Sequence, residues 1–282
     1  MPPRMVHETA EVFAQYRQRV LGREAAVRGP ATELLALIDA PGSGFAPLPA
    51  ALRACGLPDQ GPYTVVTVSL GAEEGGAERG AGALEEVLRH LTGHRFAAAR
   101  PARGGAAAVI AADSASPEAV ASALKDLWPA LHACDEAALP YGGVSALAAG
   151  PQELNGALVQ ARYALTAAGR TGGTEGAAKL VAIEDLTTLG ALLAGVPDDV
   201  RTAFGRHALG PLADDTNPSH RMLLETLDTF LAHNGSWART AEAMRLHVNT
   251  VHYRIGRVEL FTGRDLGRLE HKLDLKTALL CR

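Results

Sequence analysis

The sequence predicts an α+β fold with a mixed sheet in the middle of the chain, followed by an all-α region at the C-terminus. Between residues 61 and 195, strand-like apolar runs alternate with helical stripes in the order βαββαβαβ, which is typical of a sheet with helices packed against it. From residue 217 on, apolar residues recur at helical spacing. With 282 residues, 47% of them hydrophobic, the chain has room for about two domains.

Residues 1–60 are predicted to form an N-terminal helical segment and a linker. The segment 33–38 (ELLALI) carries an apolar face, and 41–49 (PGSGFAPLP) is turn-rich, as linkers are. An uneven helical stripe precedes them, made of Phe13, Tyr16, Val20 and Val27. These apolar faces suit either a partner helix or the rest of the same domain, and the pattern does not separate the two.

The middle region, 61–212, is predicted to be one α+β domain with trailing helices. Its strands are short apolar runs, one of its helices shows the apolar stripe Leu84, Val87, Leu88 and Leu91, and Pro117 and Pro151 mark the starts of two others. In chain order we expect a strand at 63–70, a helix around 84–91, strands at 95–100 and 106–112, a helix over 116–134, a strand at 141–148, a helix over 151–168 and a strand at 179–183.

The C-terminal region, 217–282, is predicted to be a separate helical domain. Asn217-Pro218 is a good cap and first-turn pair, and the stripe that follows ends at His233-Asn234-Gly235. Beyond residue 262 a closing helix is expected over Leu269, Leu273 and Leu280. These helices supply enough apolar residues for a small core of their own.

Residues 236–258 (SWARTAEAMRLHVNTVHYRIGRV) contain two short helical patterns joined by a turn, which predicts a helix-turn-helix. The first apolar stripe is Trp237, Ala241 and Met244, and the second is Val251, Ile255 and Val258. Ser236 can cap the first helix and His247 the second. The opposite face of the second helix is polar and cationic, which suits the DNA major groove.

The charge distribution agrees with this interpretation. Residues 219–282 carry ten Lys or Arg against seven Asp or Glu, a balance of +3, whereas the residues before them carry 17 against 24, a balance of −7. The net charge of −4 therefore hides a basic C-terminal end, which phosphate would attract.

The run from 223 to 266 closely resembles the C-terminal DNA-binding domain of PucR/CdaR-type bacterial transcription regulators. The resemblance rests on the spacing His-x-Asn-Thr-x-x-Tyr-Arg, followed by Thr-Gly and Asp-Leu, found here at His247, Asn249, Thr250, Tyr253, Arg254, Thr262-Gly263 and Asp265-Leu266. It implies sequence-specific binding of promoter DNA. The chain departs from the pattern at Val248, often polar or basic in the family, and at Arg245, where many helix-turn-helix proteins have Gly.

We predict that the second helix binds duplex DNA through a set of eight residues: His247, Val248, Asn249, Thr250, His252, Tyr253, Arg254 and Arg257. Arg254 and Arg257 would anchor phosphates or guanines, and the polar residues of the first turns would lie nearest the base edges.

Several of these residues have structural alternatives. His247 is expected to act mainly as a cap, and Asn249 and Thr250 could bind phosphate without reading a base. Tyr253 could pack on the preceding helix. Arg254 could cover apolar surface or pair with a neighbour.

The element order of the middle region, with the segment VSALAAGPQELNGALVQARYAL, resembles the degenerate GGDEF-like domain that precedes the DNA-binding domain in the same regulators. A cyclase of that fold needs carboxylates on the first strand and hairpin to hold divalent metal. Here the hairpin reads Gly104-Gly105-Ala106 and the strand ends Val68-Ser69-Leu70. We therefore expect no enzyme activity and no catalytic, metal or cofactor site. Two alternatives stay open: a nucleotide or metabolite sensor acting through protein contacts, and a residual nucleotide-handling enzyme.

The expected partners are double-stranded DNA, a second copy of the chain in a homodimer, and a small-molecule effector of unknown identity. No signal peptide or membrane span is apparent, so a cytoplasmic protein without membrane contact is expected. The three cysteines, Cys55, Cys134 and Cys281, are far apart and outside any CxxC pattern, which supports neither a disulfide framework nor a zinc site.

Overall fold

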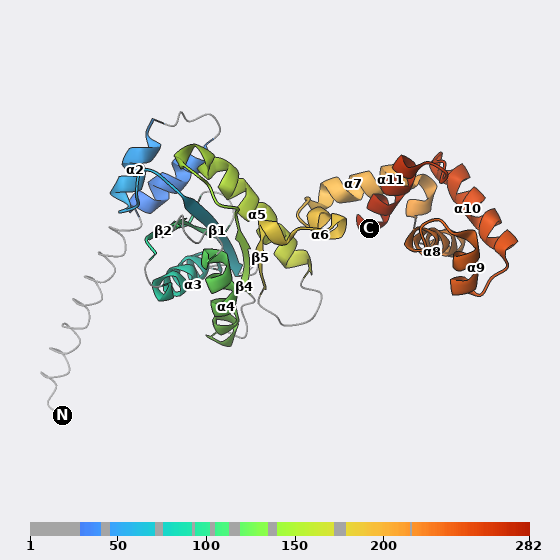
Figure 1. Ribbon diagram of the computed structural model, residues 1–282, viewed down its shortest axis with the longest axis horizontal. Helices are drawn as coiled ribbons and strands as arrows, with labels where there is room; N and C mark the ends of the chain where they lie inside the picture. The colour runs from blue at the N-terminus through green and yellow to red at the C-terminus, as the bar shows by residue number, and fades with distance from the viewer. Residues whose placement is uncertain are drawn as a thin grey trace, which may run out of the picture. The chain divides into compact units, whose positions relative to one another are not determined.

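The computed structural model describes residues 29–40, 46–70, 76–91, 94–101, 105–112, 119–134, 140–171, 179–214 and 216–282. The chain divides into two compact units, Met1–Thr187 and Thr188–Arg282, each with its own core (Figure 1). The apolar residues predicted as a stripe at 13–27 lie outside the described residues.

The first unit contains a five-stranded mixed sheet, as predicted. Its strands run in the order β2-β3-β1-β4-β5, with antiparallel neighbours except for the parallel pair β4 and β5. The elements are β1 Tyr63–Leu70, α3 Gly76–His90, β2 Phe96–Ala99, β3 Ala106–Ala111, α4 Ala119–Cys134, β4 Pro140–Val144, η1 Pro151–Glu153, α5 Leu154–Thr171, β5 Lys179–Ala182 and η2 Ile183–Asp185.

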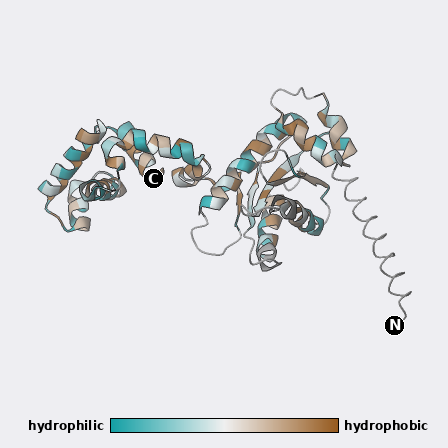
Figure 2. Cartoon of the chain, turned by 180° about the vertical axis from the view of Figure 1, so that it is seen from behind, coloured by the Kyte–Doolittle hydropathy of each residue, from teal (hydrophilic) through white to brown (hydrophobic). Residues whose placement is uncertain are grey.

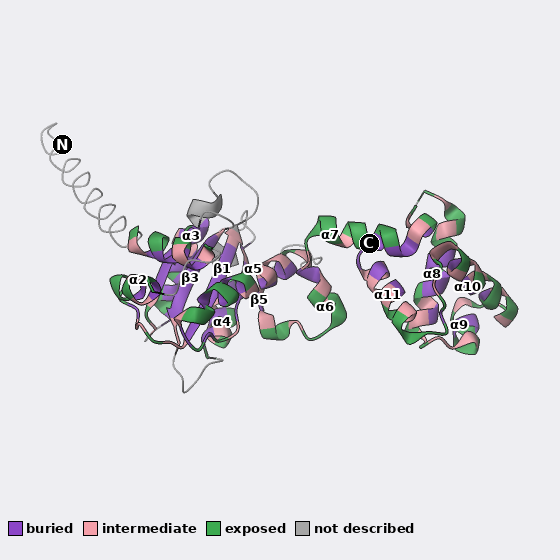
Figure 3. Ribbon diagram, turned by 90° about the horizontal axis from the view of Figure 1, so that it is seen from above, coloured by how far each residue is buried: buried purple, intermediate pink, exposed green. Residues whose placement is uncertain are grey.

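Helices cover both faces of the sheet because its strands are apolar on both sides. Val65 packs on one face with α5, with a helix over 29–39 and with α2 (Leu48–Ala54). Val66 packs on the other face with α3 and α4. Figure 3 shows the resulting burial of the strands between the two helical layers. The apolar segment 33–38 therefore packs on its own domain, one of the two alternatives that the sequence left open.

The strand predicted at 141–148 is shorter in the structure and ends at Val144. The chain then leaves the ladder and returns at Ala148, which forms an isolated bridge with Tyr63. Ser145 holds the departure point, because its hydroxyl accepts a hydrogen bond from the Val65 amide at 2.9 Å. Within β4, a Cβ on Gly143 would lie 2.0 Å from the Ala161 carbonyl oxygen, so only glycine lets α5 pack this closely on the sheet.

The side chain of Tyr63 is fully buried at the start of β1 and donates a hydrogen bond to the Pro58 carbonyl at 2.8 Å. Burial, with a smaller contribution from the charge of Asp59, raises the pKa of this phenol from 10.0 to about 12.

The folded protein thus keeps the proton of Tyr63, which the unfolded chain releases near pH 10. We expect the free energy of unfolding to fall as pH rises from about 10 to 12, and Tyr63→Phe to remove this dependence.

Absorbance titration at the tyrosinate band should show a phenol that ionises about two pH units above the ordinary tyrosine value of about 10. Ionisation of every tyrosine near pH 10 in the folded protein would contradict the burial of Tyr63.

The second unit is all-helical, as predicted, and its core is built from one apolar stripe on each helix. In Figure 2 these helices carry both hydrophobic and hydrophilic residues along their length. They are α6 Leu189–Ala194, α7 Asp198–Leu209, η3 Gly210–Ala213, α8 Pro218–Ala232, α9 Trp237–Met244, α10 Val248–Thr262 and α11 Leu269–Leu280.

The sequence analysis assigned the helices before residue 212 to the middle domain and began the C-terminal domain at 217. In the structure the chain divides at Thr187 and Thr188, so α6 and α7 belong to the second unit. Ala208 and Leu209 of α7 are buried in the core of that unit, and Arg201 donates to the Leu280 carbonyl of α11 at 2.8 Å. None of the helices that the structure describes is both long and apolar enough to cross a bilayer.

Candidate nucleic-acid interface

Helices α9 and α10 are joined by a three-residue connection whose geometry is set by two caps. The Ser236 hydroxyl accepts from the Arg239 amide at the start of α9, and His247 Nδ1 accepts from the Asn249 amide at 3.2 Å at the start of α10. Between them, Leu246 donates its amide to the Ala241 carbonyl at 2.8 Å, which closes the end of α9. Each cap predicted from the sequence is present.

Arg245 adopts the left-handed conformation, with φ of 53°, at the end of α9. This conformation costs an L-residue about 1–2 kcal/mol, whereas glycine adopts it without strain. Glycine, however, loses more conformational entropy on folding than other residues do, which offsets part of the gain. We therefore expect Arg245→Gly to raise the free energy of unfolding by about 0.5–1 kcal/mol. Thermal unfolding of the full chain measures this effect. Arg245→Ala is the matched control, because it removes the same charge but keeps the strain, and it should bring no gain.

One side of α10 is anchored in the core of the second unit. Val251, Ile255 and Val258 are fully buried there. Val248, which the sequence analysis included among the DNA contacts, is half-buried and packs against the same core. Its side chain thus fixes the start of α10.

The opposite side of α10 is open to solvent. Asn249, His252 and Tyr253 are exposed, with 69% of Tyr253 accessible, and Thr250 is half-buried beside them. The structure thus brings these four predicted contact residues to one face over the first two turns of the helix. Tyr253 does not pack on α9 as the structural alternative supposed, since most of its surface is free.

The two arginines of α10 differ in their surroundings. Arg254 Nη1 donates to the Thr226 hydroxyl of α8 at 3.3 Å, and Thr226 is completely buried. Arg257 is half-buried, with its guanidinium carbon 4.7 Å from the centre of the Phe261 ring, within the range of a cation–π interaction. Arg254 therefore ties α10 to α8, while Arg257 lies along its own helix with its charge near the surface.

Three side chains that the sequence analysis did not select also lie at this interface. Arg239 on α9 and Arg245 in the connection are exposed and add positive charge beside α10. Trp237, assigned to the apolar stripe of α9, is only half-buried, and its ring lies against His252. The charge of the two arginines was visible in the sequence, whereas no spacing signalled the contact between Trp237 and His252.

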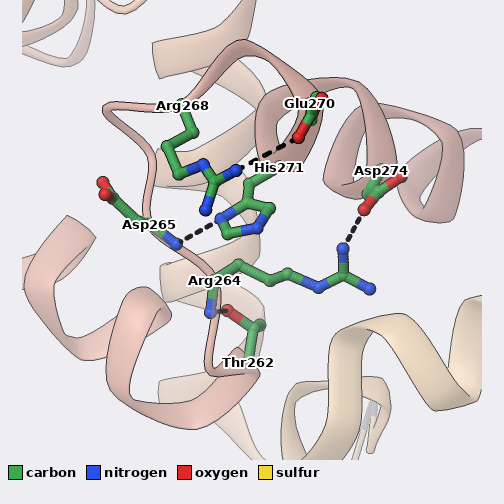
Figure 4. A network of polar contacts seen from close by, with 7 residues as sticks. All are labelled: Thr262, Arg264, Asp265, Arg268, Glu270, His271 and Asp274. Atoms are coloured by element: carbon green, nitrogen blue, oxygen red, sulfur yellow. Dashed lines mark hydrogen bonds and ion pairs between the residues drawn. The ribbon is translucent and has the colours of Figure 1, made fainter.

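The Thr262-Gly263 and Asp265-Leu266 pairs at the end of α10 stabilise the connection to α11, and Figure 4 shows the polar contacts of Thr262 and Asp265. Gly263 ends α10 with φ of 66°, and the Thr262 hydroxyl accepts from the Arg264 amide. The Asp265 amide donates to His271 Nδ1 at 2.9 Å, and Leu266 is buried in the core. Arg264 also pairs with Asp274 of α11, and Arg268 with Glu270. These residues therefore have a structural role, since they fix the connection between α10 and the start of α11.

Across the residues with described side chains, no three His, Cys, Asp or Glu side chains converge as metal ligands would. The hairpin residues 102–104 lie outside the described residues, and Gly105 sits so close to β1 that a Cβ there would lie 1.8 Å from the Val68 carbonyl oxygen. A hollow of about 440 Å³ lies beside β2, with an apolar lining that includes Phe96 and with the charged side chains of Glu85 and Arg89.

Comparison with known proteins finds a matching domain family in each unit. Residues 223–281 match the PucR C-terminal helix-turn-helix domain, and residues 42–167 match the GGDEF-like domain. The C-terminal helices are thus similar to the PucR helix-turn-helix domain. Both resemblances noted in the sequence are thereby confirmed, and α10 lies within the segment that matches the PucR domain.

Individual relatives match over shorter segments. An uncharacterised protein of Thermomonospora curvata is 45% identical over 82 residues, which cover 29% of this chain and 44% of that protein. The transcriptional activator PmfR of Paenarthrobacter nicotinovorans is 42% identical over 65 residues, 23% of this chain and 14% of the activator. The chain therefore spans less than half the length of these curated relatives.

A regulator of polyketide synthase expression from Bifidobacterium adolescentis is similar to this chain among solved structures. The two share 20% sequence identity, with a TM-score of 0.38, and the match covers 89% of this chain and 90% of the solved one.

Proposed function

We propose that this protein is a transcriptional regulator that binds promoter DNA through the exposed face of α10, as a homodimer. The observation that carries the proposal is the match of residues 223–281 to the PucR helix-turn-helix, together with the polar, solvent-open face of α10 within that match. A relative that is 42% identical over 65 residues is named a transcriptional activator, which agrees with this role.

The chemistry of the face suits the major groove. The amide of Asn249 can pair in bidentate fashion with adenine, and the hydroxyl of Tyr253 can reach a base or a phosphate. Arg239, Arg245 and Arg257 would neutralise phosphates on either side of the helix. In a homodimer two such helices would enter half-sites about one helical turn apart, roughly 34 Å.

We propose that the first unit has a sensory and not an enzymatic role, in the cytoplasm. Its first strand ends in Val68-Ser69-Leu70 and its hairpin in Gly and Ala, so the carboxylates that a cyclase uses to hold metal are missing from these positions in the sequence. The hollow beside β2 is large enough for a small-molecule effector, with a mostly apolar lining and few charged groups.

Selection of genomic DNA fragments by the purified full-length protein tests the proposal. Enrichment of one symmetric motif, with an affinity that falls as salt rises, is the expected result. Recovery of fragments without a shared motif, or an affinity independent of salt, would count against a site-specific regulator. Turnover of GTP with Mg²⁺ or Mn²⁺ would instead support the enzyme alternative.

A further inference from the structure

Three aromatic rings connect the core of the second unit to the exposed face of α10. Phe230 of α8 is buried, and its ring centre lies 4.6 Å from that of Trp237 on α9. Trp237 in turn stacks on His252, with ring centres 3.9 Å apart and planes inclined by only 13°. A histidine on the solvent face is thus held flat against a tryptophan that is itself fixed by the core.

This stacking changes what His252 can do at a binding surface. An exposed side chain that is free to rotate loses about 0.5–1.5 kcal/mol of conformational freedom when a partner immobilises it. The ring of His252 is already oriented by Trp237 before any partner arrives. Because the stack occupies a face of the imidazole, both ring nitrogens remain at its edge, where they can donate or accept hydrogen bonds.

We infer that His252 is a specificity-determining contact to a base edge and that Trp237 is its positioning residue. The inference rests on the proposed function, since it assumes that the face of α10 meets duplex DNA. A flexible histidine near phosphate would add affinity to every sequence alike, whereas an oriented ring edge favours one pattern of donors and acceptors in the groove. Trp237 contributes through His252, so the effects of the two side chains on sequence discrimination are coupled.

A double-mutant cycle tests this coupling. The measured quantity is the ratio of the dissociation constant for a scrambled duplex to that for the enriched site, at one salt concentration. We expect His252→Ala to lower this ratio about 10-fold, the loss of one good base contact, and Trp237→Leu to lower it by a similar factor. The double variant should then be no worse than His252→Ala alone.

Two results would overturn the inference. In the first, the two single effects multiply in the double variant, which would show that Trp237 acts independently of His252. In the second, His252→Ala weakens both duplexes equally, which is the behaviour of a phosphate contact. If no site is enriched at all, the proposed function fails before the cycle begins, so the two failures are distinguishable.

Trp237→Phe is a second variant, to be used if Trp237→Leu does not fold. Phenylalanine keeps an aromatic face for His252 and an apolar contact for Phe230, and we expect it to retain most of the discrimination. Loss of discrimination in a folded Trp237→Phe protein, with His252→Ala harmless, would also contradict the assignment.

Discussion

Replacement of both Asn249 and Arg257 by alanine is expected to weaken binding to the enriched DNA site by about 100-fold or more. Each good contact to a base edge or phosphate contributes about 1–3 kcal/mol, and the two side chains lie two turns apart on α10, so their losses should nearly add. Titration of labelled duplex by the full-length protein measures the loss.

The single variants should differ in their salt dependence. Arg257→Ala removes a cation, so the slope of log affinity against log salt should fall by about 1 if the guanidinium neutralises a phosphate. Asn249→Ala should leave the slope unchanged and reduce discrimination between sequences. Arg206→Ala is a matched control for charge, because this exposed arginine lies on α7, outside the helix-turn-helix. An unchanged affinity in the double variant would show that these residues are not the DNA contacts.

Most of the fold could be predicted because its signals are local. The alternation of strand and helix patterns gave the element order of the mixed sheet, and the caps at Ser236, His247 and Gly263 marked the ends of helices that the structure contains. Where the prediction differed, long-range contacts decided the outcome. The strand predicted at 141–148 ends at Val144, where the Ser145 hydroxyl accepts from the Val65 amide, and the chain rejoins β1 only at the isolated bridge of Ala148; no pattern in that segment encodes this pairing.

The same distinction holds at the candidate interface. The sequence placed His252 on the polar face of α10 correctly, since helical spacing determines which residues share a side. It gave a structural alternative to Arg254 and none to Arg257, but it could not name the partner, because Thr226 of α8 accepts from Arg254 only in the folded unit. The stack of Trp237 on His252 likewise joins two helices, and helical periodicity describes one helix at a time.

The two sides of α10 therefore constrain each other. A helix can present contact residues in a fixed orientation only if its buried side is held firmly, and Val251, Ile255 and Val258 provide that hold. The turn between α9 and α10 contains a strained residue, because Arg245 adopts a positive φ of 53° there.

Adjacent residues on α10 should consequently respond in opposite ways to alanine. Ile255 is fully buried, and Ile255→Ala should lower the free energy of unfolding of the second unit by about 2–5 kcal/mol through lost burial and the cavity left behind. Gly256 is exposed, and a Cβ there would meet nothing within 4 Å. Gly256→Ala should therefore raise the free energy of unfolding by about 0.5–1 kcal/mol, because alanine favours the helix.

Thermal unfolding of the two variants in the full chain provides the comparison, with circular dichroism to follow the helical unit. A shift downward of about 10 °C or more is expected for Ile255→Ala, against a smaller shift upward for Gly256→Ala. Equal shifts in the same direction would mean that α10 is not oriented with Ile255 inward and Gly256 outward. That orientation is the premise of the DNA-binding face, so this stability measurement tests the interface without any DNA present.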